Sequence, residues 1–313
     1  MNDNSIKIVF FGTPNIATIT LNELIKQFRV IAVVTQPDKP AGKEKKIEAT
    51  PVKRIAQDYG IKIFQPKDLI TIGKDLSSLS PDIGVLFAYK NTVPKDIINL
   101  FPFGILNIHP SLLPKYRGPS PVQSAILNNE TKTGVTIIKI DEEIDHGPII
   151  AQKEVQMNYG ENANDLLQRL SIIGTQLLME SISKYINKEI TPQDQEHSEA
   201  TKTNTISREN GLINWKNNAK SIYLQYRAYF PWPGAYTQFM GKRFKIIDLN
   251  ILESIMENTY APGTIFSTKN EDLAVQCEKS AIILYQIQLE GKKPISGKDF
   301  LLGYKDSIGK ILG

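Results

Sequence analysis

Alternating strand and helix patterns over the first half of the chain constrain its fold more than any other feature. Short apolar runs typical of buried strands occur at Ile6–Phe11, Val30–Thr35, Ile61–Phe64, Ile83–Phe87 and Gly104–Ile108. Helical patterns lie between the early runs, at Ala17–Gln27 and at Pro51–Tyr59, where Thr50 is placed to cap the helix and Pro51 occupies its first position. This alternation predicts an α/β fold with a mostly parallel sheet covered by helices.

The second half changes character after a polar stretch. A helix is predicted at Pro121–Leu127, strands at Val135–Ile140 and Ile149–Val155, and a long amphipathic helix at Ala163–Tyr185. Residues 188–207 have the composition of a linker. A helix at Lys216–Arg227 follows, and then five predicted strands: Tyr236–Phe239, Arg243–Asn250, Gly263–Ser267, Leu273–Gln276 and Ala281–Leu289.

A chain of 313 residues exceeds what one hydrophobic core usually supports, so two domains are expected. We place a catalytic domain at 1–189, a linker at 190–206 and a small β-rich domain at 207–313. No apolar run approaches the roughly 20 residues that span a bilayer, and the first strand begins too early to leave room for a signal peptide. The single Cys277 cannot form an internal disulfide and is expected in the core. We therefore expect a cytoplasmic protein without a membrane partner, as a monomer.

Positive charge is concentrated in two parts of the chain. Residues 208–313 contain 14 basic and 10 acidic residues, which accounts for the whole net charge of +4. Within the neutral remainder, residues 38–54 contain six basic and three acidic residues. This distribution is compatible with a polyanionic partner, although a solvated protein face has the same composition.

Asn107 and His109 are the first candidates for chemistry. Residues two apart on a strand point to the same face, and Pro110 ends this strand at the edge where open α/β sheets bind ligands. Asn offers an amide donor, and His can donate or accept a proton. Together they could stabilise an oxyanion during acyl transfer. The alternative is that both side chains only satisfy backbone groups of the next loop.

Two further segments flank this pair. Residues 111–121 contain three prolines and one glycine, which stiffen the loop, and Arg117 in it could hold an anion or pin the loop. The acidic segment 141–147 could supply a carboxylate that orients His109 or accepts a proton, or it could be a solvated hairpin turn. His146 could join the site but is more consistent with a surface role. His197 lies in the polar stretch and is expected to have no role.

The sequence NIHPSLLPKYRG, followed by PVQSAIL and TGVTIIKIDEEIDHG, resembles the 10-formyltetrahydrofolate-dependent formyltransferases. The resemblance implies a Rossmann-like catalytic domain in which Asn107 and His109 polarise a formyl carbonyl. It also implies that Asp145 sets the state of His109 and helps remove the amine proton. The resemblance assigns the binding of 10-formyltetrahydrofolate, as co-substrate, to Ser111, Leu112, Leu113, Pro114, Phe87, Ala88, Tyr89, Asp141, Glu142, Glu143 and Ile144. It requires no metal.

Other segments resemble the members of this family that act on methionyl initiator tRNA. These segments are FFGTPNIA near the start, SRENGLINW at 207–215 and FPWPGAY at 230–236. The stretch 35–53 resembles the basic loop with which those enzymes reach the tRNA acceptor stem, which implies tRNA contacts by Lys39, Lys43, Lys45 and Lys46. The basic tail resembles their OB-like second domain, a fold that often binds nucleic acid. The resemblance covers residues 6 to about 310.

Some positions depart from the family pattern, namely Lys90, Pro110, His146 and Pro148 near the folate pocket and Lys43 in the basic loop. Three other functions have to be distinguished from this one. A formyltransferase for nucleotide-linked amino sugars is the main alternative. A non-catalytic RNA-binding protein would not need the Asn/His/Asp set. A nicotinamide dehydrogenase would need a G-x-G-x-x-G turn, whereas only Gly12 follows the first strand.

Overall fold

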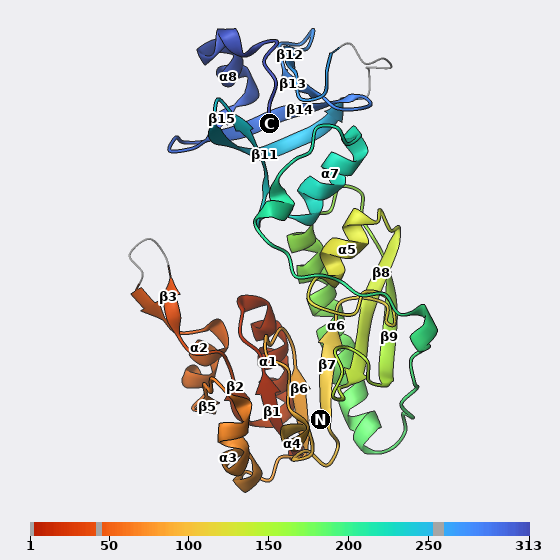
Figure 1. Ribbon diagram of the computed structural model, residues 1–313. Helices are drawn as coiled ribbons and strands as arrows, with labels where there is room; N and C mark the ends of the chain where they lie inside the picture. The colour runs from red at the N-terminus through yellow and green to blue at the C-terminus, as the bar shows by residue number, and fades with distance from the viewer. Residues whose placement is uncertain (1–2, 42–45, 253–259) are drawn as a thin grey trace. The chain divides into compact units, whose positions relative to one another are not determined.

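The computed structural model describes residues 3–41, 46–252 and 260–313 (Figure 1). The chain divides into two compact units. The first comprises Met1–Pro121, Thr131–Met157 and Leu167–Asn204, and the second comprises Val122–Glu130, Asn158–Leu166 and Thr205–Gly313. Two short internal segments therefore belong to the same unit as the C-terminal residues, whereas the predicted domains are continuous stretches of the chain.

A seven-stranded sheet in the order β5-β2-β1-β6-β7-β8-β9 is the centre of the first unit (Figure 1). Its strands are β1 (Asp3–Phe11), β2 (Phe28–Val34), β5 (Lys62–Phe64), β6 (Ile83–Leu86), β7 (Ile105–His109), β8 (Lys132–Lys139) and β9 (Ile149–Gln156). The strands from β5 to β7 pair in parallel, and β8 and β9 are antiparallel. Ile8 to Phe11 are fully buried, as expected for a strand covered on both faces. The predicted mostly parallel α/β sheet is confirmed.

Among the described residues, the first unit contains the helices α1 (Asn15–Gln27), α2 (Pro51–Asp58), α3 (Gly73–Ser78), α4 (Lys95–Ile98) and most of α6 (Ala163–Ile186), whereas all but the first residue of α5 (Pro121–Leu127) belongs to the second unit. The predicted cap of α2 is confirmed, because Thr50 Oγ1 accepts a hydrogen bond from the Lys53 amide at 3.2 Å. Thr20 and Thr175 join α1 to α6 through a buried hydroxyl contact of 2.7 Å. A Cβ on Gly174 would lie 2.7 Å from Ile108, so α6 packs closely behind β7.

Several short elements were not predicted. The basic stretch contains β3 (Lys39–Ala41) and β4 (Lys46–Glu48), which pair as an antiparallel hairpin. Helices α3 and α4 and the 3-10 turn Leu69–Ile72 also lack a strong sequence signal. Each is too short or too polar to show a clear hydrophobic period, so tertiary contacts decide its conformation.

The second unit contains an antiparallel sheet in the order β10-β11-β14-β13-β12, with β15 paired to β14. Its strands are β10 (Ala235–Phe239), β11 (Lys242–Leu252), β12 (Ile265–Ser267), β13 (Leu273–Gln276), β14 (Ala281–Leu289) and β15 (Ile295–Ser296). The helices α7 (Ala219–Ala228) and α8 (Gly297–Gly303) and two 3-10 turns, Glu209–Gly211 and Lys305–Ser307, complete it. The predicted β-rich second part is confirmed, whereas α8 was not predicted.

Aromatic side chains form the centre of this second core. The ring of Phe300 meets those of Phe239 and Phe244 edge-to-face, each at a centroid distance of 5.3 Å. Cys277 is fully buried in the same cluster, and burial raises the pKa of its thiol to about 12. The prediction of a core role for Cys277 is confirmed. In the described part of the chain, no helix combines the length and apolar character needed to cross a membrane.

Candidate active site

Strand β7 carries Asn107 and His109 to the carboxyl edge of the parallel part of the sheet. The strand is buried throughout, and the two residues are only 8% and 4% exposed. Because they are two positions apart, they share one face of the strand. Their neighbours on β8 are Ile138 and Thr136. The structure therefore places the side chains of Asn107 and His109 on one face of the same strand, as the sequence predicted.

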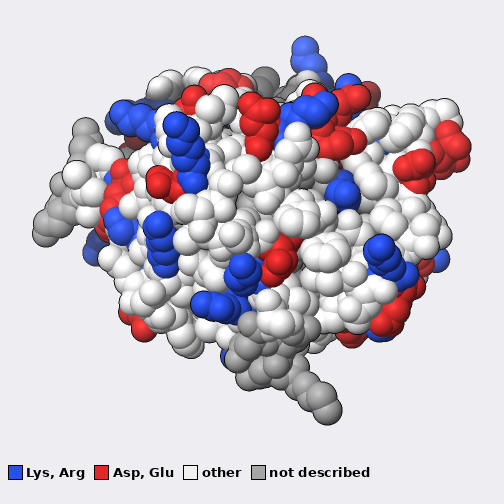
Figure 2. All heavy atoms as spheres, turned by 90° about the horizontal axis from the view of Figure 1, so that it is seen from below, with Lys and Arg blue, Asp and Glu red and all other residues white. Residues whose placement is uncertain are grey.

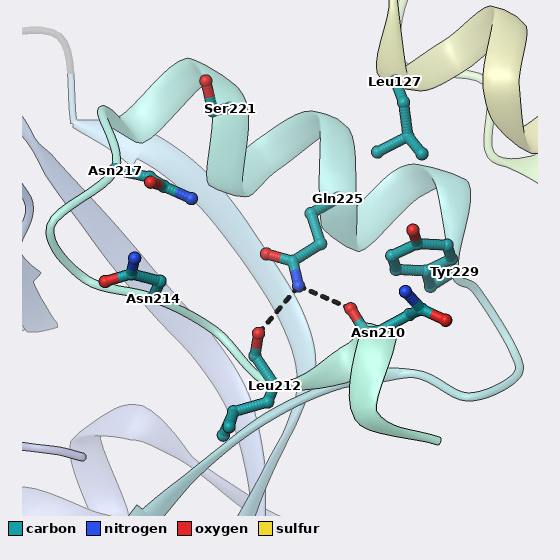
Figure 3. A pocket seen from close by; sticks show the side chains of 8 residues that line it. All are labelled: Leu127, Asn210, Leu212, Asn214, Asn217, Ser221, Gln225 and Tyr229. Atoms are coloured by element: carbon teal, nitrogen blue, oxygen red, sulfur yellow. Dashed lines mark hydrogen bonds between the residues drawn. The ribbon is translucent and has the colours of Figure 1, made fainter. Parts of the chain in front are cut away.

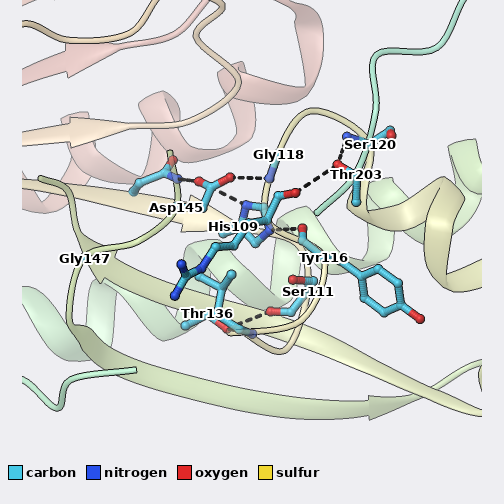
Figure 4. A network of polar contacts seen from close by, with 12 residues as sticks. His109, Ser111, Tyr116, Gly118, Ser120, Thr136, Asp145, Gly147 and Thr203 are labelled. Atoms are coloured by element: carbon cyan, nitrogen blue, oxygen red, sulfur yellow. Dashed lines mark hydrogen bonds and ion pairs between the residues drawn. The ribbon is translucent and has the colours of Figure 1, made fainter. Parts of the chain in front are cut away.

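The acidic segment between β8 and β9 brings a carboxylate to this pair (Figure 4). The Oδ1 atom of Asp145 lies 3.4 Å from Nδ1 of His109 and accepts a hydrogen bond from Nδ2 of Asn107 at 3.3 Å. Its Oδ2 atom accepts a hydrogen bond from the amide of Gly118 at 2.8 Å. Three residues that are separated in the sequence by up to 38 positions thus form one polar cluster.

The contacts of the imidazole place a proton on one of its two nitrogens. His109 Nε2 lies 3.0 Å from the carbonyl oxygen of Tyr116, which can only accept a hydrogen bond. Nε2 must therefore carry a proton in this geometry. Nδ1 faces a carboxylate oxygen of Asp145, so a proton on Nδ1 would point at that carboxylate.

The Asp145 carboxyl is pulled in opposite directions by its surroundings. Burial is the largest single influence and by itself raises the pKa of this group. The charge and hydrogen bond of His109, the Gly118 amide and the charge of Arg117 together outweigh burial and hold the pKa of Asp145 below its ordinary value. Asp145 is therefore ionised at neutral pH and can serve as the counter-charge of His109.

The loop after β7 is tied to the sheet by its backbone. Thr136 Oγ1 donates to the carbonyl of Ser111 at 2.7 Å and accepts from the amide of Leu113 at 3.1 Å. The Ser111 hydroxyl donates to the carbonyl of Lys115 at 2.7 Å. Leu112 packs over Gly134, where a Cβ would lie 2.4 Å from its Cδ2 atom. The Leu113–Pro114 peptide bond is cis. These contacts hold residues 111–114 as a rigid ledge beside His109.

The remaining residues of the predicted folate site differ in exposure, in backbone conformation and in the contacts that they make. The side chains of Phe87 and Tyr89 are buried, at 2% and 8% exposed. Ala88 between them has a left-handed backbone (φ 52°). In the acidic turn, Ile144 is 64% exposed, Glu142 forms an ion pair with Lys95, and Asp141 accepts a hydrogen bond from the Glu143 amide at 2.9 Å.

Sequence reasoning missed a second group of residues around this site. Gln195 is 5% exposed and accepts hydrogen bonds from Nε and Nη2 of Arg117 at 3.1 and 2.7 Å. Arg117 also contacts Nδ1 of His197 at 2.8 Å. The His197 ring stacks on that of His146 at 4.1 Å, so His197 is not an isolated linker residue. A polar residue in a polar stretch gives no sequence signal for such packing.

Of the four lysines in the predicted tRNA contact, only Lys39 can be described in full. It is exposed at the start of β3. Lys43 and Lys45 lie outside the described residues, as does the side chain of Lys46. Two other cations of this stretch are occupied, since Lys53 pairs with Asp38 at 2.5 Å and Arg54 with Glu48 at 3.3 Å.

The second unit has a pocket of about 270 Å³ that contains none of the predicted site residues (Figure 3). Leu127, Asn210, Leu212, Asn214, Asn217, Ser221, Gln225 and Tyr229 line it. Both amide protons of Gln225 are used, because its Nε2 donates to the carbonyls of Asn210 and Leu212 at 2.7 and 2.9 Å. No ionisable carboxylate or imidazole lines this pocket, so it lacks the acid–base groups found around His109.

The formyl transferase family model matches residues 6–182, and the model of the formyl transferase C-terminal domain matches residues 205–305. This chain therefore belongs to the formyl transferase family. Two of its relatives are methionyl-tRNA formyltransferases. The one from Roseiflexus castenholzii is 41% identical and covers 99% of both chains. The one from Thermodesulfovibrio yellowstonii is 40% identical and covers 96% of this chain and 97% of the relative.

A solved structure of another formyl transferase has a similar fold. WlaRD, a sugar 3N-formyl transferase in the presence of dTDP and 5-N-formyl-THF, is 25% identical and has a TM-score of 0.65. The match covers 92% of this chain and 99% of WlaRD. Within the described ranges, no group of three or more His, Cys, Asp or Glu side chains is arranged to hold a metal ion.

Proposed function

We propose that this protein transfers the formyl group of 10-formyltetrahydrofolate to the amino group of methionyl initiator tRNA. The observation that supports this most is the cluster of Asn107, His109 and Asp145, with contacts of 3.3 and 3.4 Å to one carboxylate oxygen. An amide donor and an imidazolium side by side suit the stabilisation of an oxyanion. The carboxylate beside them suits proton removal from an amine.

In the proposed reaction, the amine nitrogen attacks the formyl carbon, and the carbonyl oxygen gains the negative charge. Asn107 Nδ2 donates a hydrogen bond to this oxygen, and a protonated His109 ring stabilises the charge electrostatically, because its two nitrogens already face Tyr116 and Asp145. The amine proton passes to Asp145 directly or through water. The bond between the formyl carbon and N10 of the folate then breaks, and N10 receives the proton that Asp145 took up, so that Asp145 is a carboxylate again. The products are the formylated amine and tetrahydrofolate, so atoms and charges balance.

Binding of the folate is proposed for the ledge 111–114, the backbone of 87–89 and the acidic turn 141–144. The hydrogen bonds of Ser111 and Leu113 to Thr136 support this, because they leave a fixed surface next to His109. The exposed Ile144 side chain offers an apolar cover for a flat ring. In the free chain such exposure is unfavourable, and a bound aromatic ring would relieve it.

Methionyl-tRNA is the proposed acceptor because relatives that bear this name match the chain over almost its whole length. In this proposal, residues 1–189 form the domain that performs the transfer, and residues 190–206 link it to the second domain. That second domain, 207–313, holds the tRNA together with the basic hairpin. We propose that the protein acts in the cytoplasm, in agreement with its single buried Cys277. That it acts as a monomer stays a prediction.

A single assay tests the acceptor. The protein is incubated with 10-formyltetrahydrofolate and either methionyl initiator tRNA or a nucleotide-linked amino sugar, and both products are quantified. We expect formyl-methionyl-tRNA and no formylated sugar. Formylation of the sugar alone would replace this proposal with the sugar-nucleotide alternative, which the likeness to WlaRD makes the best second candidate.

A further inference from the structure

Residues 193–203, named here the strap, are fastened to the catalytic unit at both ends. At the first end, the backbone of Gln193 exchanges hydrogen bonds of 2.7 and 2.9 Å with that of Ile149 at the start of β9. At the other end, the amide of Arg117 donates to Thr201 and the amide of Thr203 donates to Arg117, at 2.8 and 2.7 Å. The strap therefore connects the two backbone segments that surround Asp145.

Gln195, near the start of the strap, uses its whole hydrogen-bonding capacity on these two segments. Its Nε2 donates to the carbonyl oxygens of Asp145 and Gly147, at 2.9 and 2.7 Å. Its Oε1 accepts the two hydrogen bonds from Arg117. Because carbonyl oxygens only accept and a guanidinium only donates, these partners fix the orientation of the amide. Gln195 thus bridges the acidic turn and the loop that carries Gly118.

The acidic turn requires such support. Asp145 has a left-handed backbone (φ 52°), which residues with a side chain rarely adopt. Gly147 approaches the sheet so closely that a Cβ there would lie 1.9 Å from the carbonyl oxygen of Lys139. Gln195 holds the carbonyls of both residues. Figure 4 shows the Asp145 carboxylate, carried by this turn, between the amide of Gly118 and the ring of His109.

We propose that Gln195 is a positioning residue that fixes the Asp145 carboxylate against His109 without touching either substrate. The inference rests on the proposed role of Asn107, His109 and Asp145 in formyl transfer. A displacement of the carboxylate by 1 Å would remove contacts that are already 3.3–3.4 Å long. Misplacement of this size lowers rates by about 100-fold in other enzymes.

A second link between the strap and the acidic turn runs through two histidine rings. His197 receives a hydrogen bond from Arg117 at 2.8 Å and stacks on His146 with an angle of 2° between the rings. Nδ1 of His146 lies 2.6 Å from Asp141 at the beginning of the acidic turn. The strap therefore contacts the later part of the turn at Asp145, His146 and Gly147, and His146 in turn contacts Asp141 at its beginning.

Gln195→Met tests the proposal, because methionine has a similar shape but cannot form the four hydrogen bonds. Gln193→Met is the matched control, since its side chain is exposed on the same strap. We expect Gln195→Met to lower kcat of formyl transfer by about 10- to 100-fold, with KM for both substrates within twofold. Gln193→Met should leave kcat within twofold. A kcat of Gln195→Met equal to that of the control would overturn the proposal.

A second variant and a mutant cycle separate positioning from general destabilisation. Gln195→Glu keeps an acceptor for Arg117 and loses both donors to the turn, so it should fold and still lose rate. In an Asp145→Asn background, Gln195→Met should lower kcat by less than threefold, because the group it positions is already gone. An equal loss in both backgrounds would indicate a merely structural role and contradict the proposal.

One readout is independent of the substrates. The protein has three histidines, so the ring N–H signals of His109 can be assigned by NMR. Gln195→Met should shift or broaden the Nδ1–H signal of His109, and Gln193→Met should leave it in place. An unchanged signal in Gln195→Met would overturn the positioning role. If the signal shifts but the wild-type protein formylates no methionyl-tRNA, the proposed function fails and the positioning role remains.

Discussion

At the scale of single residues, the Asp145 carboxyl is subject to opposing influences on its pKa. Burial alone would favour its neutral form, yet His109, the Gly118 amide and Arg117 hold its pKa below the ordinary value. Charged hydrogen bonds of this kind contribute more than neutral ones. The same contacts that prepare Asp145 for proton transfer should therefore also stabilise the folded chain.

This predicts a pH-dependent stability that can be assigned to one carboxyl. Because the pKa of Asp145 is lower in the folded than in the unfolded chain, its contribution is complete above the ordinary carboxyl range. It disappears as the pH falls through the folded pKa. At pH 7, Asp145→Asn should lower the free energy of unfolding by roughly 2 kcal/mol.

Urea unfolding at several pH values between 7 and 3 measures this effect. The difference between wild type and Asp145→Asn should shrink as the solution becomes more acidic. Other carboxyl groups titrate in both proteins and cancel in the comparison. A difference that stays constant across this range would show that the ion pair does not stabilise the fold.

The candidate site could be predicted only in part from its residues. Asn107 and His109 were found because strand periodicity places residues i and i+2 on one face. The backbone strain at Asp145 and the bridging amide of Gln195 gave no sequence signal, because both depend on contacts across about 50 positions of the chain. The resemblance to formyltransferases, rather than spacing, identified Asp145 among its acidic neighbours.

At the scale of elements, the predictions succeeded where apolar runs or a helical period stood out from the flanking polar residues. The predicted bounds of β13, β14 and α5 agree with the structure, and α6 differs by one residue. The pattern failed for β3, β4, α3, α4 and α8, which are short and polar. A short helix gains little from its own hydrogen bonds, so its existence depends on packing that the sequence does not reveal.

Helix α7 begins at a capping residue whose contribution to stability can be measured. Asn218 caps it by accepting a hydrogen bond from the Ser221 amide at 2.8 Å. Asn218→Ala should lower the free energy of unfolding by about 1 kcal/mol. The neighbouring Asn217→Ala is the control, since Asn217 is exposed and precedes the cap. Equal unfolding midpoints of the two variants in urea would argue against capping at Asn218.

At the scale of the whole molecule, electrostatics bear on the proposed tRNA partner. The face shown in Figure 2 carries basic and acidic side chains intermingled, without a continuous patch of one sign. This face therefore gives no electrostatic argument for a polyanion. The proposed tRNA contact depends instead on particular lysines, of which the exposed Lys39 is the one that the structure describes in full.

Lys39→Ser tests this dependence. If Lys39 contacts a phosphate, its loss should weaken tRNA binding at low salt. It should also reduce the slope of log K against log salt concentration by about one, because fewer counterions are released. Lys74→Ser, an exposed lysine on α3, serves as control. A slope equal to that of the control would remove Lys39 from the proposed interface.

The central claim is that Asn107 and His109, oriented by Asp145, promote formyl transfer to methionyl-tRNA. The most direct test is the single-turnover rate of formyl transfer by Asn107→Ala and His109→Ala, with Asn99→Ala at the exposed end of α4 as control. Loss of an oxyanion donor or a proton-transfer group should lower this rate by about 100-fold or more, while Asn99→Ala stays near wild type. Rates within threefold of wild type for both folded variants would contradict the account.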